Sequence, residues 1–349
     1  MGSKETTKKM KKKCLITGGA GYVGSALTKY LLRKGYDIKI FDACYFGKKS
    51  LKQVINKIEL VEGDIRTPPK DLFKGVESVV HLAGFSNDPM AEFDPASNKI
   101  INTKASVDLA KKAKKDGVER FVYASTASIY DLGIGEGDWL KDETALVHPQ
   151  HHYSLSKFRA EEDLNMLVDD NFCITSLRKG TIYGYSPRMR FDLVVNVMLK
   201  YALELGTIKV FCKGVQWRPL LNINDAVVAY YKTLTASKSN INGEVFNIVS
   251  TNIQMKHLAV KMQKILNEVL GLEVKVVYEQ DDKQDRSYRM IGKKAKDVLG
   301  FVPKPDLKKS VTDMVYWINK EKIYEKFNDP IYYNIKWMEP ILKDVGGVS

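Results

Sequence analysis

The sequence has no apolar segment close to the roughly 20 residues that a membrane-spanning helix needs, so we expect no membrane partner. It has no internal repeat and no low-complexity linker. The basic, polar start of the chain lacks the apolar core of a secretory signal, which favours a cytoplasmic protein. The cysteines are few and scattered singly, as is typical of reduced thiols and not of disulfides or a metal site. They are Cys14, Cys44, Cys173 and Cys212.

Acidic residues are fewer than basic residues, and the formal net charge is +13. Residues 1–11 are rich in lysine and are predicted to form a disordered basic tail. The other lysines are spread along helix-like segments such as "AKKAKKDG", which is typical of solvated faces. We therefore expect no nucleic-acid partner. The positive field suits an anionic small-molecule substrate better.

Apolar strand-like segments alternate with helical patterns through the first half of the chain. They read "CLITG", "DIKIFDA", "KIELVEGD", "SVVHLAG", "RFVYAST" and "CITSLRKGTIYG". This alternation predicts an α/β fold with a doubly wound parallel sheet. Its ligand is expected outside the carboxyl ends of the strands. After about residue 185 the regular alternation of strands and helices ends, and the remaining sequence predicts a smaller C-terminal lobe.

Residues 14–43 contain the glycine pattern of a dinucleotide site between a strand and a helix. Gly18, Gly21 and Gly24 let the backbone turn tightly and approach a diphosphate, and Tyr22 and Val23 open the helix behind them. Asp42 ends the next strand. Its carboxylate can accept hydrogen bonds from both ribose hydroxyls and would repel a 2′-phosphate, so NAD is the predicted cofactor. The lysines at 48 and 49 leave NADP as an alternative.

Tyr153 and Lys157 are four residues apart, so they share one face of a helix. A nearby ammonium, together with the positive nicotinamide ring, is expected to lower the pKa of the phenol and make it a better base. The strand "RFVYAST" delivers Ser125 and Thr126 to the same sheet edge, where a hydroxyl can hold the substrate oxygen. These groups predict a hydride-transfer centre.

The segments "TGGAGYVG", "FDA", "GDI", "HLAG", "YASTASIY" and "YSLSK" occur in this order, and together they resemble the extended short-chain dehydrogenase/reductases. The resemblance is closest to the NAD-dependent epimerase/dehydratase family that acts on nucleotide sugars, and it covers about residues 12–320. It implies that Thr126, Tyr153 and Lys157 are catalytic and that Lys157 also holds the nicotinamide ribose. It further implies cofactor contacts by a second set of residues. They are Asp64, Ile65, Leu82, Ala83 and Gly84.

A nucleotide-diphosphate sugar is the implied substrate. Arginine forks suit phosphate oxygens, and the chain offers Arg188, Arg190, Arg218 and Arg286. By the resemblance, Arg218 and Arg286 clamp the diphosphate and Asn196 contacts a phosphate or the base. The "SNDP" segment adds Ser86 and Asn87 as substrate-binding candidates. His148, His151 and His152 match no familiar metal spacing, so no metal is predicted.

The family organisation predicts a Rossmann-type NAD-binding domain over 12–185 and 221–249. The nucleotide-sugar-binding lobe is then expected over 186–220 and 250–349. The helix at 105–116 and the helix carrying Tyr153 have apolar stripes that pair in family homodimers, so a homodimer is predicted. Packing of both stripes on the sheet is the alternative.

The reaction type depends on the two residues after Thr126. Related 4,6-dehydratases carry acids there, and decarboxylases carry a glutamate, whereas this chain has Ala127 and Ser128. A 4-keto sugar then has no neighbouring acid to drive elimination and can take its hydride back on the other face. This predicts a C4 epimerase for surface-polysaccharide or glycan precursors. A C4 dehydrogenase or reductase, a 4,6-dehydratase using an acid such as Asp88, and a non-catalytic dinucleotide-binding protein are the alternatives.

Overall fold

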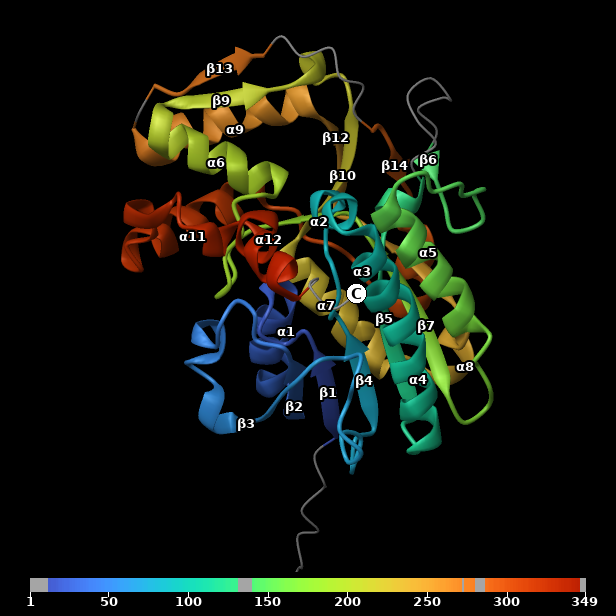
Figure 1. Ribbon diagram of the computed structural model, residues 1–349. Coiled ribbons are helices and arrows are strands. Elements are labelled where there is room, and N and C mark those ends of the chain that lie inside the picture. The colour runs from blue at the N-terminus through green and yellow to red at the C-terminus, as the bar shows by residue number, and fades with distance from the viewer. Residues whose placement is uncertain (1–11, 131–139, 272, 280–285, 346–349) are drawn as a thin grey trace, which may run out of the picture.

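A seven-stranded parallel sheet is the centre of the computed structural model, which describes residues 12–130, 140–271, 273–279 and 286–345. The strand order is β11-β7-β5-β4-β1-β2-β3 (Figure 1). The strands are β1 (Lys13–Thr17), β2 (Asp37–Asp42), β3 (Ile58–Glu62), β4 (Ser78–His81), β5 (Arg120–Thr126), β7 (Cys173–Lys179) and β11 (Val245–Ile248). The order reverses between β1 and β4, which is the point where doubly wound sheets bind their ligands. The predicted fold class is confirmed.

Helices cover both faces of the sheet because successive strand residues point to opposite sides. Leu15 packs with Leu109 and Ala110 of α4 (Ser106–Lys115), and α5 (His152–Asn165) lies beside it. Ile16 packs on the other face with Leu27 of α1 (Tyr22–Arg33) and Ala226 of α7 (Ile223–Thr235). The buried apolar residues of α4 and α5 thus pack on the sheet, and the homodimer remains a prediction.

A second lobe has its own core. Val195 and Leu199 of α6 (Val194–Leu205) pack with Leu258 and Met262 of α9 (Met255–Leu270) and Met314 of α11 (Leu307–Lys320). Two small sheets complete this lobe. They are β9 (Thr207–Val210) with β13 (Lys275–Tyr278), and β12 (Thr251–Gln254) with β10 (Trp217–Asn222) and β8 (Thr181–Tyr183).

The segment "CITSLRKGTIYG", read as one strand from the sequence, is two strands in different sheets. β7 ends at Lys179, and β8 begins at Thr181 and pairs with β10. Gly180 separates them, and a Cβ atom there would come within 2.8 Å of the Pro219 carbonyl oxygen. Only glycine lets the chain cross from one sheet to the other at this close approach.

Other short helices and strands, and the last helix, pack around these two cores. They are α2 (Asp88–Phe93), α3 (Pro95–Lys99), a π-helical turn (Ile100–Ala105), β6 (Leu140–Lys141), α8 (Lys238–Ile241), β14 (Arg289–Met290), α10 (Lys293–Leu299) and α12 (Asn334–Val345). α12 lies between the large sheet and α6 (Figure 1). The predicted tail at 1–11 and the chain end after 345 lie outside the described residues.

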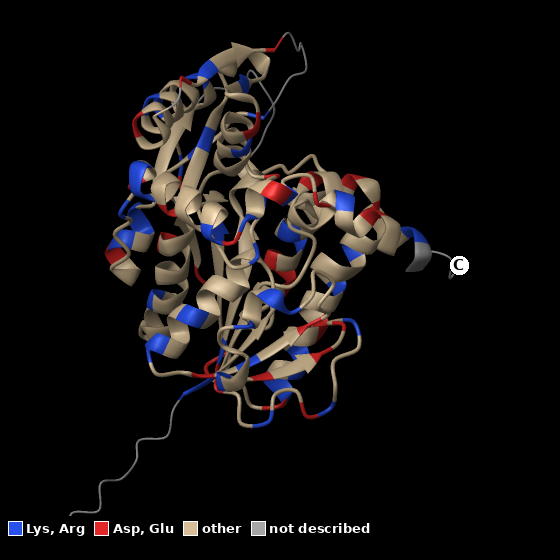
Figure 2. Ribbon diagram, turned by 90° about the vertical axis from the view of Figure 1, so that its left-hand side faces the viewer, with Lys and Arg blue, Asp and Glu red and all other residues tan. Residues whose placement is uncertain are grey.

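Charges are distributed along the surface elements. Lysine and arginine alternate with acids on the helices of both lobes (Figure 2), and several pairs are four residues apart, such as Lys104–Asp108 at 2.6 Å and Lys112–Asp116 at 2.7 Å. Such pairs are solvated and each adds only tenths of a kcal/mol. In the part of the chain that the structure describes, no helix has the length and apolar character needed to cross a membrane.

Candidate active site

The glycine-rich turn forms a cradle at the carboxyl end of β1. Gly18 has φ +70°, and a Cβ atom there would lie 2.7 Å from the amide nitrogen of Ala83. A Cβ atom on Gly24 would lie 2.2 Å from the Gly18 carbonyl oxygen. Larger residues are therefore excluded at both positions. Gly21 is the N-cap of α1 and has no capping side chain, so the first amides of the helix face the cavity and fit a diphosphate.

Asp42 lies at the end of β2 and is fixed by two backbone amides. Its Oδ2 accepts a hydrogen bond from Ala20 N at 2.9 Å, and its Oδ1 accepts one from Cys44 N at 2.7 Å. Burial raises the pKa of this carboxyl, and the amide hydrogen bonds oppose that shift. Lys48, one of the two lysines that leave NADP as an alternative, forms an ion pair with Glu62. The carboxylate thus lines the cavity with a fixed orientation.

A cavity of about 520 Å³ runs from this cradle to the second lobe. Nearly all of the predicted site residues line it. They are Gly18, Gly21, Tyr22, Val23, Asp42, Asp64, Ile65, Leu82, Ala83, Gly84, Ser86, Asn87, Thr126, Tyr153, Lys157, Arg188, Arg190, Arg218 and Arg286. These residues come from segments far apart in the sequence, so the fold brings them together. Their roles remain predictions.

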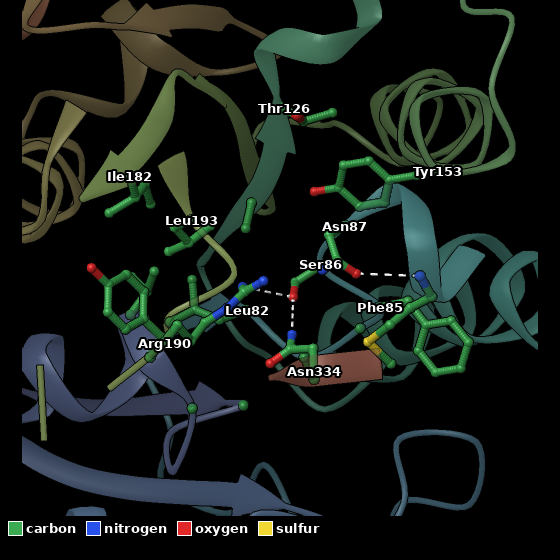
Figure 3. Close-up of a pocket in the computed structure, with 18 of the residues that line it drawn as sticks. Leu82, Phe85, Ser86, Asn87, Thr126, Tyr153, Ile182, Arg190, Leu193 and Asn334 are labelled. Carbon is green, nitrogen blue, oxygen red and sulfur yellow. Dashed lines mark hydrogen bonds between the residues drawn. The ribbon is translucent and has the colours of Figure 1, made fainter. Parts of the chain in front are cut away.

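Thr126, Tyr153 and Lys157 meet at the reacting end of the cavity. Thr126 ends β5, and its hydroxyl lies 2.8 Å from that of Ser128. Tyr153 is in the first turn of α5, and Figure 3 shows its hydroxyl directed from the helix toward the centre of the cavity. Lys157 lies one turn further along, with its ammonium 4.8 Å from the centre of the Tyr123 ring. Hydroxyl, phenol and amine therefore line one site.

The expected lowering of the Tyr153 pKa is wrong for the protein alone. Burial raises the pKa of the phenol, Asp88 raises it further, and the Thr126 hydroxyl and Arg190 oppose the shift. Burial also lowers the pKa of Lys157 to about 7. Burial favours the neutral form of both groups, and it outweighs the attraction that the helical spacing suggested.

A hydrogen-bonded group forms the wall opposite Tyr153. The Ser86 hydroxyl accepts hydrogen bonds from Arg190 at 3.0 Å and from the side-chain amide of Asn334 at 2.7 Å (Figure 3). Asp192 accepts from Arg190 at 2.8 and 2.9 Å and from the amide of Asn87 at 3.2 Å. Asn334 begins α12, so the last helix is tied directly to this wall.

The other arginines occupy different parts of the cavity. Arg286 pairs with Asp88 through hydrogen bonds of 3.0 and 2.6 Å. Arg218 donates to the Trp217 carbonyl oxygen at 3.0 Å. Arg188 lies 3.8 Å from the Phe46 ring centre, near the cofactor cradle, and burial lowers its pKa to about 9.

Asn196 is the one predicted site residue that does not line the cavity. Its side chain is fully buried and accepts a hydrogen bond from Gly184 N at 3.1 Å. It donates to the Arg190 carbonyl oxygen at 2.9 Å and to the Tyr22 hydroxyl at 3.2 Å. All of its partners are protein groups, so in this structure it holds the Arg190 loop against the glycine-rich turn.

Sequence reasoning missed Asn102 and His81. Asn102, in the π-helical turn, accepts from Phe85 N at 2.8 Å and donates to the Phe85 carbonyl oxygen at 3.1 Å, which fixes the loop after β4. His81 bridges the hydroxyls of Thr17 and Ser106 at 2.7 and 2.8 Å. Nothing in their spacing marks either residue, because each acts through partners distant in the sequence.

Lys179 is a third missed residue, and it had a usable signal. It is the last residue of β7 and lines the cavity. A charged side chain at the carboxyl end of a parallel strand is the same signal that identified Asp42. The sequence reading extended this strand to Tyr183 and so overlooked it.

Comparisons with known proteins agree with this geometry. The model of the NAD dependent epimerase/dehydratase family matches residues 14–249. A putative UDP-glucose 4-epimerase of Methanocaldococcus jannaschii is 27% identical over 87% of this chain and 97% of its own length. UDP-glucuronic acid decarboxylase 1 of Xenopus tropicalis is 26% identical over 93% of this chain and 76% of its own. The structure of a UDP-glucose 4-epimerase from Thermotoga maritima with UDP-glucose has a TM-score of 0.78 and 25% identity, and the match covers 89% of this chain and 99% of that one.

The family match spans most of the large sheet, including the glycine-rich turn, Thr126, Tyr153 and Lys157. The residues that line the cradle also fit the dinucleotide. The chain therefore belongs to the NAD dependent epimerase/dehydratase family, and NAD is its cofactor.

Proposed function

We propose that this protein is a nucleotide-sugar 4-epimerase. One observation carries the proposal: in the described residues, the carboxylates that line the cavity are all engaged by other groups. Asp42 is held by backbone amides, Asp64 by Arg66, Asp88 by Arg286 and Asp192 by Arg190. The positions after Thr126 hold Ala127 and Ser128. A 4-keto sugar would meet no available acid for elimination.

Tyr153 is the proposed base for the C4 hydroxyl, because its phenol points into the cavity beside Thr126. The Thr126 hydroxyl positions the same substrate oxygen and shortens the proton path. Lys157 stabilises the phenolate as it forms. NAD held by the glycine-rich turn, Asp42 and Lys157 would supply a reversible hydride acceptor for C4. The phenol gives the proton back once the sugar presents its other face.

The substrate diphosphate is proposed to lie along the arginine side of the cavity. Arg218 and Arg286 border it from β10 and from the loop before β14. The Asp88–Arg286 pair is proposed to stay in place, with the same guanidinium also contacting a phosphate oxygen, since a guanidinium carries five N–H donors and the pair uses two of them. The sugar then lies between Tyr153 and the Ser86–Arg190 wall.

The names of the relatives do not agree on one activity, because one is called an epimerase and another a decarboxylase. The Asp88–Arg286 pair also bears on the dehydratase alternative, because Asp88 is the acid that it would use. We favour the epimerase and infer that its product feeds glycan precursor synthesis, since nucleotide sugars are glycosyl donors.

The test is the mass and C4 configuration of the product from a panel of UDP-, dTDP-, GDP- and CDP-sugars. An unchanged mass with inverted C4 supports the proposal. Loss of water would assign a dehydratase, and a two-hydrogen change would assign a dehydrogenase. Product analysis by NMR separates a C4 epimer from epimers at other carbons.

A further inference from the structure

Lys179 lies at the reacting end of the cavity and has no role in the mechanism above. It is the partner of Thr126 in the register of β5 and β7, so their backbones are about 4.8 Å apart. Both side chains line the cavity. Its ammonium lies 6.0 Å from the centre of the Tyr230 ring.

No acid neutralises Lys179 within the described residues. Among the described residues, burial lowers the pKa of Lys179, and the ammonium of Lys157 lowers it further. Carboxylates elsewhere in the cavity are engaged, as shown above. A partly buried ammonium without an acidic partner is costly, and an incoming negative group would relieve that cost.

The position of Lys179 decides which ligand group supplies the negative charge. The cofactor diphosphate belongs at the α1 end, beside the glycine-rich turn. The substrate diphosphate belongs beside Arg218 and Arg286 on the second lobe. The nicotinamide ring and the sugar both belong at the Thr126–Lys179 edge, and of these two only the sugar can carry a negative group there. C6 is bonded to C5, the ring atom next to the reacting C4, so a carboxylate at C6 fits this requirement.

We propose that Lys179 binds the C6 carboxylate of the sugar and that the substrate is a nucleotide-diphosphate uronic acid. This inference rests on the proposed function and names its substrate class. It also has a chemical consequence, because oxidation of a uronic acid at C4 gives a β-keto acid. Such an acid can lose CO₂: the C5–C6 bond breaks, its electron pair moves to the C4 carbonyl, and C5 takes a proton. A Lys179–carboxylate bond holds the charge on the carboxylate and opposes that loss.

The experiment compares UDP-glucuronic acid with UDP-glucose, which differ only at C6. For the wild-type protein we expect kcat/KM to be at least about 10-fold higher with the uronic acid. Lys179→Met should lower kcat/KM for UDP-glucuronic acid by about 10- to 100-fold and change the value for UDP-glucose by less than about 3-fold. Lys179→Arg keeps the cation and should retain part of the preference. Lys74→Met, at an exposed position away from the cavity, is the matched control and should match the wild type.

An equal loss with both sugars, or a wild-type preference for UDP-glucose, would overturn the inference. Calorimetric binding of the two UDP-sugars to the wild-type protein separates it from the proposed function. If the uronic acid binds more tightly but is not converted to an epimer, the epimerase proposal is wrong and the Lys179–carboxylate contact is supported. If UDP-glucose is epimerised and the protein shows no preference for the uronic acid, the epimerase proposal is supported and the Lys179 inference is wrong. If Lys179→Met fails to fold, the wild-type comparison alone still decides.

Discussion

Burial moves the pKa values of Tyr153 and Lys157 in opposite directions although the two side chains share one face of α5. The pKa of the phenol rises and that of the amine falls to about 7, so both are neutral for much of the physiological range in the protein alone. Charge returns only when a ligand supplies a counter-charge. Burial therefore keeps the Tyr153 phenol protonated until substrate and cofactor are in place.

Replacing Tyr153 with phenylalanine tests the proposed base. The ring and its packing stay, but the proton acceptor is lost, so turnover should fall by about 10²-fold or more. NAD binding should change little, because the cradle at Gly18 and Asp42 is untouched. Product formation and NAD binding are measured on the same preparation. Near-normal turnover by Tyr153→Phe would remove Tyr153 from the mechanism.

The lowered pKa of Lys157 predicts how stability depends on pH. Between about pH 7 and the ordinary lysine value, the unfolded chain binds this proton and the folded chain does not. The free energy of unfolding of the cofactor-free protein should therefore rise with pH in this window, with a contribution from Lys157 of about 1 kcal/mol per pH unit. Urea unfolding from pH 7.5 to 9 measures it. Lys157→Met should remove that slope, and an identical slope in both proteins would contradict the shift.

Single residues were predictable where one side chain carries the chemistry and its place follows from strand order. Asp42, Thr126 and Tyr153 are of this kind, because each lies at a sheet edge or a first helical turn. Asn196 does not line the cavity, because its amide serves a buried loop, and its contact with substrate stays a prediction. Asn102 could not be found because it acts through the Phe85 backbone, seventeen positions away in the sequence.

At the scale of elements, a buried ion pair fixes the catalytic helix to the sheet. Arg178 of β7 donates to Glu161 of α5, at 3.1 and 3.2 Å from its Nε, and to the Tyr130 hydroxyl at 2.8 Å. Tyr130 in turn donates to Asn247 of β11 at 2.7 Å. Both charged side chains are only 6% exposed, so neither can be satisfied by water if its partner is lost.

Removing one member of this pair should cost more than removing both. Glu161→Leu leaves the Arg178 charge buried without its carboxylate, and we expect a loss of about 3–5 kcal/mol in the free energy of unfolding. The double variant Glu161→Leu, Arg178→Met buries no orphan charge and should recover much of that loss. Urea denaturation of the four proteins completes the cycle. A double variant whose loss equals the sum of the two single losses would argue against the coupling.

The terminal helix shows why packing partners escape sequence reasoning. α12 contains Pro340, a residue that weakens the interior of a helix. In the structure Met338 packs with Phe85 and Met90, and the Trp337 indole donates to the Tyr45 carbonyl oxygen at 2.7 Å. The helix thus joins the loop after β2, which contains Tyr45, to the Ser86–Arg190 wall of the cavity. Periodicity shows that a helix has an apolar face but not what that face covers.

At the scale of the whole molecule, the alternation of strands and helices was enough to predict the sheet, because parallel strands need crossover helices. The second lobe was predictable only from the place where the alternation of strands and helices ends. Its small sheets join strands such as β8 and β12 that are nearly seventy residues apart, and the β7–β8 break depends on one close approach at Gly180. The cavity between the lobes follows from that break.

Because the cavity joins both lobes, cofactor binding should stabilise the whole molecule. The protein stripped of nucleotide should gain about 2.7 kcal/mol in its free energy of unfolding when NAD is added at 100 times its dissociation constant. NADP at the same concentration should give a much smaller gain, since its 2′-phosphate would meet the Asp42 carboxylate that Ala20 and Cys44 hold in place.

Two substitutions make this cofactor test specific. Asp42→Asn removes the repelling charge and should reduce the difference between the stabilisation by NAD and the stabilisation by NADP. Lys48→Met is the control, because Lys48 pairs with Glu62 and should leave the difference unchanged. Thermal or urea unfolding with each nucleotide measures the difference. Equal stabilisation of the wild-type protein by the two nucleotides would show that Asp42 does not face the adenosine ribose, whatever reaction the cavity performs.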